Sequence, residues 1–403
     1  MGGAATAHVG RGDEASREGA PGPARIRPYV ARTQEALYAD IDLELSWSER
    51  ELPERERTKH VHRLHPYLGK FIPQLVETLL ARYVPAGGRV LDPFAGSGTT
   101  LVQALESGHP ATGIDVAAFN CLLMRVKTAR YNEFVLEHEL RDALGRFRAV
   151  DGSLQGLSLG RGYIGRWFAP QAARELLALR SIVTDYAHAD VLRVVLARAA
   201  RSARLTTHFD LDFPQEPQTA PYWCHKHKRE CSPVNRAEHF IQRYALDTLA
   251  RIKAFARVRA REAEAEVVHG DARELALGCR FDAVVTSPPY PGLIDYHEQH
   301  RYAYELLGLD DCRELEVGAA AAGTSKRALA AYRDGIVDVL LNVREALRPS
   351  APVAIVVNDR RDLYPEILER AGLRLEQRLR RHVNRRTGRR AGEYFEDVLV
   401  ARV

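Results

Sequence analysis

Short apolar runs separated by helical patterns divide much of the chain into alternating strands and helices. Residues 89–92 and 111–115 are two such runs, each ending in aspartate, and the segment between them has helical spacing. Residues 266–271 and 281–286 resume the pattern after a long interval, and residues 351–358 add a further apolar run. This alternation predicts a parallel α/β sheet.

The interval between the second and third runs, residues 117–265, is too long for a connection within a sheet. Leu176, Leu179 and Ile182 recur at helical intervals, whereas residues 208–233 are irregular and rich in proline and histidine. We therefore expect a doubly wound α/β domain made of residues 46–116 and 266–403. A mostly helical insertion interrupts it between the second and third strands.

The first 45 residues lack apolar periodicity and predict a flexible tail. Apolar residues make up 45% of the 403 residues and charged residues 28%, which is ordinary for a soluble globular protein. No apolar run reaches the roughly 18 residues of a membrane span, and the first residues show no signal-peptide pattern. We expect a cytoplasmic protein without a membrane partner.

Residues 92–100, Asp-Pro-Phe-Ala-Gly-Ser-Gly-Thr-Thr, form a glycine loop between the first strand and its helix. Leu101 stands where a dinucleotide fingerprint needs a third glycine, and no lysine follows Gly98 as in a P-loop. Asp92 suits a cationic amino group better than a pyrophosphate. Asp115, at the next strand end, is placed to accept hydrogen bonds from ribose hydroxyls, and Asp271 is a candidate partner for an adenine amino group.

Ser287-Pro288-Pro289-Tyr290 follows the fourth apolar run. The prolines fix the backbone and remove two N–H donors, so the turn is rich in acceptors. The Ser287 hydroxyl and the Pro288 carbonyl could grip the two N–H bonds of an aromatic amine and free its lone pair for attack. Tyr290 would stack on the ring that carries the amine. Tyr296 and its neighbours Asp295, His297 and His300 could line the same pocket or simply cap a helix.

Together the two motifs resemble the S-adenosylmethionine-dependent DNA amino-methyltransferases, which methylate exocyclic nitrogens of bases. The resemblance implies a mostly parallel, seven-stranded, Rossmann-like methyltransferase sheet and S-adenosylmethionine as cofactor. Residues 65–73 resemble the element that closes over the methionine end of the cofactor, with Lys70 and Phe71 at matching positions. The cofactor motif is matched throughout by Asp92, Pro93, Phe94, Ala95, Gly96, Ser97, Gly98, Thr99 and Thr100.

Serine at the head of the second motif points, within this family, to the branch that methylates N4 of cytosine. The target base must leave the duplex stack to reach such a pocket. An adenine-N6 enzyme with an atypical serine remains a rival, as do an RNA base amino-methyltransferase and a non-catalytic DNA-binding regulator. The family also suggests a restriction-modification setting, with a cognate nuclease as partner.

Two basic segments favour DNA binding, and the helical insertion is the candidate for target recognition. A solvated charge run explains the segments equally well. Contacts between basic side chains and phosphates position DNA without reading its sequence. The candidate residues are Arg380, Arg381, Arg385 and Arg386 near the C-terminus, and Lys226, Lys228 and Arg229 in the insertion.

Five scattered cysteines make a disulfide framework improbable. Cys224, His225, His227 and Cys231 carry four zinc-ligand types within eight residues. Their spacing is not that of a standard finger, and four ligands from one short loop would be strained. We therefore expect no metal, and a packed loop with histidines near phosphates, with zinc as the alternative.

Overall fold

The computed structural model describes residues 41–403 except 49, 68, 70, 154–159, 161, 209, 211–213 and 384–393. The described chain lies within one compact unit, Asp40–Val403. Residues 1–40 of the predicted tail lie outside the described residues. Its last residues are ordered, since Leu45 is fully buried and the Asp42 backbone N–H donates to the Arg380 carbonyl at 2.7 Å. The ordered unit thus begins slightly before residue 46.

Seven strands of the described chain form one sheet in the order β5-β2-β1-β6-β7-β9-β8. The first five are parallel, whereas β9 runs antiparallel to both β7 and β8. This confirms the predicted mostly parallel, seven-stranded sheet. The strands are β1 (Val90–Asp92), β2 (Ala111–Asp115), β5 (Ala265–His269), β6 (Ala283–Thr286), β7 (Pro352–Val357), β8 (Arg374–His382) and β9 (Phe395–Arg402).

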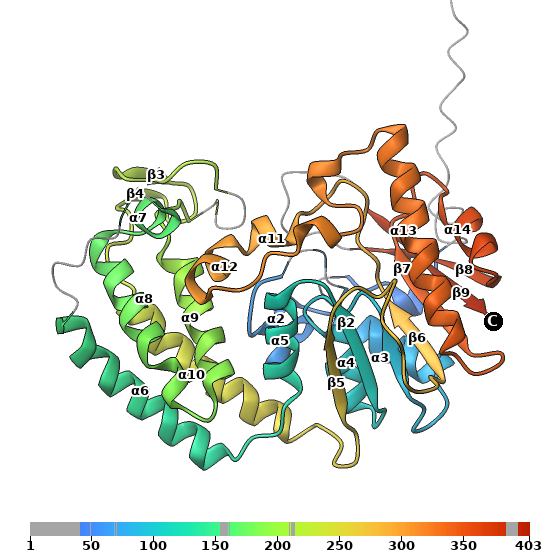
Figure 1. Cartoon of the computed structure of the whole chain (residues 1–403), viewed down its shortest axis with the longest axis horizontal. Helices are drawn as coiled ribbons and strands as arrows, with labels where there is room; N and C mark the ends of the chain where they lie inside the picture. Colours follow the sequence, from blue (N-terminus) through green and yellow to red (C-terminus); the bar gives the residue numbers. More distant parts are fainter. Residues whose placement is uncertain are drawn as a thin grey trace, which may run out of the picture. The chain divides into compact units, whose positions relative to one another are not determined.

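Helices cover both faces of the sheet, as its wholly buried central strands require. Leu91 and Val284 pack on one face with α13 and α14, whereas their neighbours Val90 and Val285 pack on the other with α3 and α4 (Figure 1). Adjacent strand residues therefore point to opposite cores. These helices are α3 (Pro73–Tyr83), α4 (Thr99–Glu106), α13 (Lys326–Glu345) and α14 (Tyr364–Arg370).

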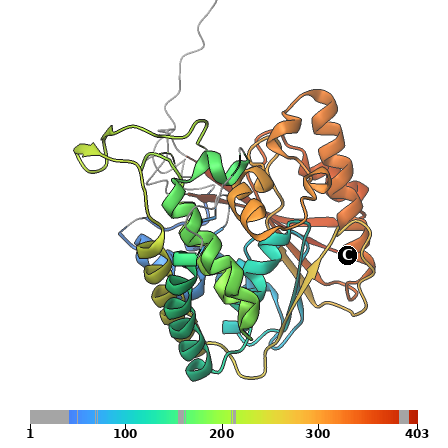
Figure 2. The same cartoon turned by 60° about the vertical axis from the view of Figure 1, so that its left-hand side comes forward.

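The segment between β2 and β5 is mostly helical, and its helices lie beside the sheet (Figure 1). They share one hydrophobic core with α12 (Arg301–Leu307) and η2 (His60–Arg63), and Figure 2 shows them after a turn of 60° that brings them forward. The elements are α5 (Ala118–Thr128), α6 (Glu133–Ser153), α7 (Tyr163–Trp167), α8 (Pro170–Ile182), η3 (Val183–Asp185), α9 (Ala189–Ala203), the hairpin strands β3 (Tyr222–Cys224) and β4 (Arg229–Cys231), and α10 (Glu238–Ala256).

Short helical elements complete the described chain. They are η1 (Leu43–Leu45), α2 (Glu54–Arg57), η2 (His60–Arg63), α11 (Tyr296–Gln299), α12 (Arg301–Leu307), η4 (Arg313–Leu315) and η5 (Ala320–Ala322). None of the described helices has the length and apolar character that crossing a bilayer demands.

Gly113 lets helix α4 pack directly on strand β2. A Cβ atom at this position would lie 2.5 Å from Leu101 Cδ1 and 2.9 Å from the Ala95 Cβ. Both distances are too short for real contacts, so any side chain would push the helix and the glycine loop away from the strand.

We expect Gly113→Ala to lower the free energy of unfolding by about 1–3 kcal/mol, because overpacking displaces Leu101. Gly145→Ala is the matched control: Gly145 lies in α6, where an added Cβ meets nothing within 4 Å. That change should stabilise the protein by roughly 0.5–1 kcal/mol through helix propensity. Urea denaturation measures both, and equal stability of the two variants would contradict the packing argument.

Candidate active site at the ends of β1 and β6

The two motifs meet because their strands are parallel neighbours in the sheet. Thr286 is the last residue of β6, and its hydroxyl donates to Asp92 Oδ1 at 2.6 Å. Both side chains are buried. The Thr100 hydroxyl at the start of α4 donates to the Val285 carbonyl at 3.2 Å. The glycine loop and the Ser-Pro-Pro-Tyr turn therefore leave the same edge of the sheet.

The glycine loop needs glycine at two positions. Gly96 and Gly98 have φ angles of 51° and 80°, in the left-handed region that other residues rarely adopt. A Cβ on Gly98 would also lie 2.8 Å from Met124 Cγ. Gly98 is the N-cap of α4, so the free N–H groups of that helix begin at this loop.

One cavity opens between the two motifs, with about 870 Å³ of empty space including its mouth. Phe71, Asp115 and Asp271 line it, and Ser287 and Pro289 line it from the second motif. The glycine loop contributes Pro93, Phe94, Ala95, Gly96, Ser97 and Thr99. Asp92, Gly98 and Thr100 do not line the cavity; Asp92 and Thr100 are buried at the strand end and the start of α4.

Asp115 ties the glycine loop to the end of β2. Its Oδ2 accepts from the Gly96 N–H at 2.8 Å, and its Oδ1 accepts from the Ala117 N–H at 2.8 Å and from Asn120 Nδ2 at 3.0 Å. Burial raises the pKa of Asp115 to about 7, with a smaller contribution from Glu316. A carboxylate has about four acceptor positions, so Asp115 can accept a further hydrogen bond from a ligand.

Asp92 holds a buried oxygen without a partner. Its Oδ1 accepts from Thr286 and from the Phe94 N–H at 3.1 Å, but no described residue hydrogen-bonds to Oδ2. Burial raises the pKa of Asp92 to about 6. An unpaired buried carboxylate oxygen is costly, and a cationic ligand group close to this strand end would relieve that cost.

Asp271 already has a cationic partner in this structure. Arg273 Nε lies 2.9 Å from both of its carboxylate oxygens. Burial acts to raise the pKa of Asp271, but the hydrogen bonds from Arg273 outweigh it and the pKa lies below its usual value. Asp271 thus lines the cavity as a paired carboxylate.

The Ser287 hydroxyl is oriented by the next strand of the sheet. It donates to the Val356 carbonyl of β7 at 2.9 Å, so its hydrogen is engaged while its oxygen can still accept. Ser287 lies at the cavity wall, whereas Pro288 is buried.

Tyr290 does not line the cavity. Its ring packs with the core beneath α13 and α14, and its hydroxyl donates to Glu396 at 3.1 Å. Burial, and then the Glu396 charge, hold the pKa of Tyr290 well above its usual value. Stacking of Tyr290 on a base stays a prediction, and it would require this partly buried ring to reach the cavity.

The cavity residues that sequence reasoning missed include the polar side chains of Tyr67, Asn120 and Glu316. The Tyr67 ring stacks on Tyr296 at 5.3 Å and 14°, and its hydroxyl accepts from Asn120 Nδ2 at 3.1 Å. Glu316 accepts from the His297 backbone N–H at 3.1 Å. Tyr67 falls inside the segment that resembles the closing element, and Asn120 lies about one helical turn beyond Asp115, but Glu316 has no comparable signal.

The residues after the turn were expected either to line the pocket or to cap a helix, and the structure contains both cases. Tyr296 lines the cavity, whereas Asp295 caps α11 by accepting from the Glu298 N–H at 2.9 Å. His297 and His300 are buried, and the His300 ring stacks on Tyr67 at 5.6 Å. They support the cavity wall from behind.

The predicted DNA-contacting residues lie in different surroundings. Arg380 is exposed, with its guanidinium 4.4 Å from the Phe395 ring centre. Arg381 is only 4% exposed and lies 3.8 Å from Glu396, which does not support contact with phosphates. Lys226, Lys228 and Arg229 are exposed on the β3–β4 hairpin. Lys70, Arg385 and Arg386 lie outside the described residues.

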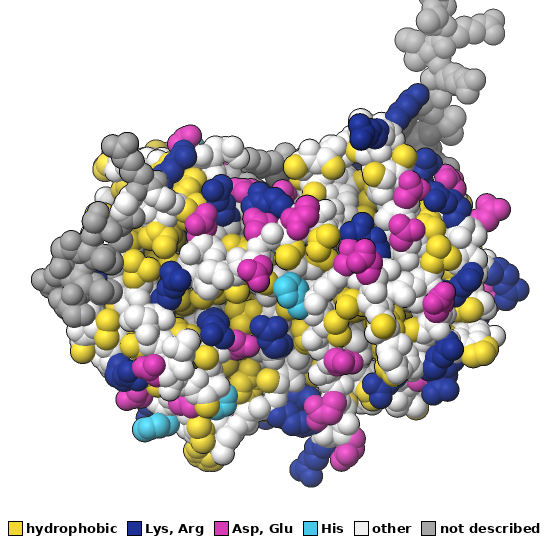
Figure 3. Space-filling model, viewed as in Figure 1, with side chains coloured by type: hydrophobic (Ala, Val, Ile, Leu, Met, Phe, Trp, Pro, Cys, Tyr) yellow, Lys and Arg dark blue, Asp and Glu magenta, His cyan; other side chains and the backbone are white. Residues whose placement is uncertain are grey.

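Surface charge on the face drawn in Figure 3 is mixed. Among its described residues, basic and acidic side chains alternate, and neither sign dominates a large area. This face offers no broad electrostatic footprint for a polyanion, so contact with DNA stays a prediction that rests on particular side chains.

Three of the four residues considered as zinc ligands lie close together in the structure. Cys224, His227 and Cys231 lie together with His208, whereas His225 is exposed and outside the group. The fourth member comes from the loop before β3.

The family described as DNA methylase (N6_N4_Mtase) matches residues 26–124. The type II methyltransferase M.MjaII of Methanocaldococcus jannaschii is 34% identical over 91% of this chain and 84% of its own length. The type II methyltransferase M.BsoBI of Geobacillus stearothermophilus is 22% identical over 73% of this chain and 63% of its own.

Solved structures resemble the chain only loosely. TrmN from Thermus thermophilus is 14% identical, covers 83% of this chain and 50% of its own, and has a TM-score of 0.32. The rRNA methyltransferase AviRa from Streptomyces viridochromogenes is 13% identical. The match covers 84% of this chain and 88% of AviRa, with a TM-score of 0.34. Scores this low say nothing about substrate.

The relationship to M.MjaII extends over most of both chains and agrees with the matched family. It also agrees with a cavity that joins a glycine loop to a Ser-Pro-Pro-Tyr turn. This chain belongs to the S-adenosylmethionine-dependent DNA amino-methyltransferases, the enzymes that methylate exocyclic nitrogens of bases.

Proposed function

We propose that this protein methylates the N4 amine of cytosine in DNA, on a base extruded from the duplex. The observation that carries the proposal is the Ser287 hydroxyl, which lies at the wall of the cavity formed with the glycine loop. Its hydrogen is donated to Val356, so its oxygen is available to an amine N–H.

The residues of the cavity fit the cofactor. S-adenosylmethionine supplies a methyl group on a sulfonium centre, together with an ammonium group and ribose hydroxyls. We assign the open acceptor capacity of Asp115 to the ribose hydroxyls and the unpaired oxygen of Asp92 to stabilising positive charge. Gly96 and Gly98 keep side chains out of the loop that would lie against the ligand.

Ser287 would act on the amine by positioning it. The lone pair of an exocyclic amine is delocalised into the ring, which makes the nitrogen a poor nucleophile. Acceptors on its N–H bonds favour a tetrahedral nitrogen whose lone pair points at the methyl carbon. The second acceptor that we propose is the Pro288 carbonyl. As the N–C bond forms the S–C bond breaks, so the cofactor would leave as a neutral thioether and the methylated amine would release one proton to solvent, without a covalent enzyme intermediate.

Cytosine is favoured over adenine by the residue at the head of the motif. Serine at this position is associated within the family with N4-cytosine methylation, whereas aspartate or asparagine marks other branches. The local chemistry alone admits both bases, so N6 of adenine is the second candidate. An RNA base is the least favoured substrate, because the matched relatives carry names of type II methyltransferases.

We also propose a restriction-modification setting with a cognate nuclease, and target recognition by the helical insertion. The names of the curated relatives support the setting. The exposed Lys226, Lys228 and Arg229 support the role of the insertion, since they are available to phosphates.

The product test separates the candidates directly. Incubation of the protein with labelled S-adenosylmethionine and DNA of mixed sequence, followed by nucleoside mass spectrometry, should yield N4-methylcytosine. N6-methyladenine as the main product would replace the proposal with its rival. Transfer to RNA but not to DNA would reject both.

Ser287→Ala should reduce methyl transfer by about 100-fold or more, as loss of one preorganised polar contact does in other active sites. Cofactor affinity, measured by calorimetry, should stay within a factor of a few. Ser325→Ala is the matched control, since Ser325 caps α13 and lies outside the cavity. Equal loss of cofactor binding and transfer in Ser287→Ala would show that the role is misassigned.

Cofactor affinity should rise with pH through about 7, because Asp115 has a pKa raised to about 7. Below that pH the carboxyl is protonated, and binding that favours the ionised form must release a proton. Affinity then falls by at most about tenfold per pH unit below the pKa. Calorimetry at pH values from roughly 1.5 units below to roughly 1.5 units above the pKa of Asp115 measures this dependence.

Asp115→Asn is the control for that titration. It should bind the cofactor more weakly and lose this part of the pH dependence, leaving any contribution of Asp92. An unchanged profile in Asp115→Asn would assign the titration to another group.

A further inference from the structure

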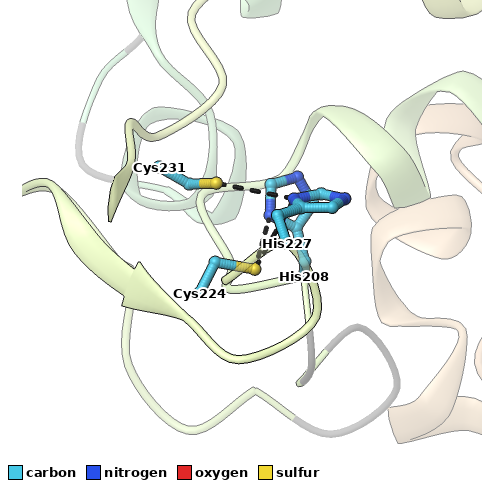
Figure 4. Close-up of side chains that lie close together, drawn as sticks. All are labelled: His208, Cys224, His227 and Cys231. Atoms are coloured by element: carbon cyan, nitrogen blue, oxygen red, sulfur yellow. Dashed lines mark hydrogen bonds between the residues drawn. The ribbon is translucent and has the colours of Figure 1, made fainter. Parts of the chain in front are cut away.

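We propose that His208, Cys224, His227 and Cys231 bind one structural zinc ion in the helical insertion. The site is separate from the proposed methyl transfer, because none of these residues lines the cavity at β1 and β6. Their candidate ligand atoms all lie within 4.8 Å of one another, and Figure 4 shows the four side chains converging.

Three of the distances within the group match those of a tetrahedral zinc site. Cys224 Sγ lies 3.6 Å from Nδ1 of both His208 and His227, and Cys231 Sγ lies 3.5 Å from His227 Nδ1. Zinc bonds of about 2.3 Å to sulfur and 2.0–2.1 Å to nitrogen, at tetrahedral angles, place sulfur and nitrogen about 3.5–3.6 Å apart. These three pairs already have the spacing of zinc ligands, and the four ligand atoms, all within 4.8 Å of one another, need to close only slightly around the ion.

The backbone explains how a short segment supplies three ligands without the strain expected from the sequence. Cys224 ends β3 and Cys231 ends β4, and the hairpin pairs Cys224 with Arg229 and Tyr222 with Cys231. The Lys228 N–H donates to the Cys224 carbonyl at 2.8 Å. The turn thus brings His227 back over both sulfurs.

The fourth ligand replaces the one expected from spacing. His225 lies on the exposed turn outside the group, whereas His208 reaches it from the loop before β3. The His208 and His227 ring centres are 4.5 Å apart. A ligand from outside the hairpin lets the ion join two segments that are distant in sequence.

Two cysteines and two histidines form a closed donor set typical of structural zinc. The hairpin has strands of three residues each, and so small a sheet is at best marginally stable alone. Trp223, the middle residue of β3, is 59% exposed, so little apolar burial holds the hairpin in place. The hairpin extends from the helices in Figure 2, and zinc would supply the missing stabilisation.

One contact competes with the ion. The Tyr222 hydroxyl lies 2.8 Å from His208 Nδ1 and accepts from the His208 backbone N–H at 3.0 Å. Binding through Nδ1 would exchange the Tyr222 contact to the ring for the metal and keep the backbone contact. Tyr222→Phe should therefore retain zinc.

The test measures metal on the full chain, purified without chelator or affinity metal and analysed by elemental mass spectrometry. We expect about one zinc ion per chain, lost in His208→Ala and in Cys231→Ser. His225→Ala is the matched histidine control, and Cys312→Ser is the cysteine control; both should retain the ion. Zinc removal by chelator should lower the Tm of the wild type, and added Zn²⁺ should restore it.

Cobalt substitution gives a second readout that does not depend on folding of a variant. Co²⁺ added to the zinc-free wild type should produce the visible absorption of a tetrahedral thiolate site. Zinc-free protein as purified that also fails to bind added Zn²⁺ or Co²⁺ would overturn the proposal. So would a disulfide between Cys224 and Cys231 in protein prepared under reducing conditions, or equal metal loss in His225→Ala and His208→Ala.

Discussion

The hydrogen bond from Thr286 to Asp92 is the constraint on which the active-site geometry depends. It joins residues 194 positions apart at the ends of two neighbouring strands, and both partners are buried. A hydrogen bond in such surroundings is costly to leave unmade. Together with the parallel pairing of β1 and β6, it fixes where the glycine loop and the Ser-Pro-Pro-Tyr turn begin relative to each other.

Burial gives the same edge of the sheet its electrostatic character. Asp92 and Asp115 have pKa values raised by desolvation, whereas Asp271 is neutralised by Arg273. The three strand-end aspartates are thus not equivalent, although they look alike in sequence. Asp115 offers a cavity ligand a free acceptor position, Asp92 keeps an unpaired oxygen buried behind the cavity, and Asp271 has already satisfied its charge within the chain.

The sequence predicted the regular part of the molecule because periodicity and strand-end motifs are local signals. The strand positions and the glycine loop were accessible in this way. Features set by packing between distant segments were not. Three such features are the inward turn of Arg381, the packing of the partly buried Tyr290 against the core of α13 and α14, and the entry of Glu316 into the cavity. They depend on how β9 and the loop before α13 pack. The exchange of His225 for His208 depends on a loop whose path no motif specifies.

Helix α5 belongs to two cores at once. Phe119 and Leu123 pack with the helices of the insertion, while Cys121 and Met124 pack with the sheet. The same helix carries Asn120, which donates to both Asp115 and Tyr67. Because α5 packs in both cores, it cannot shift within one core without changing its contacts in the other. The region that we assign to reading DNA and the carboxylate that we assign to the ribose therefore contact the same helix within less than two turns of each other.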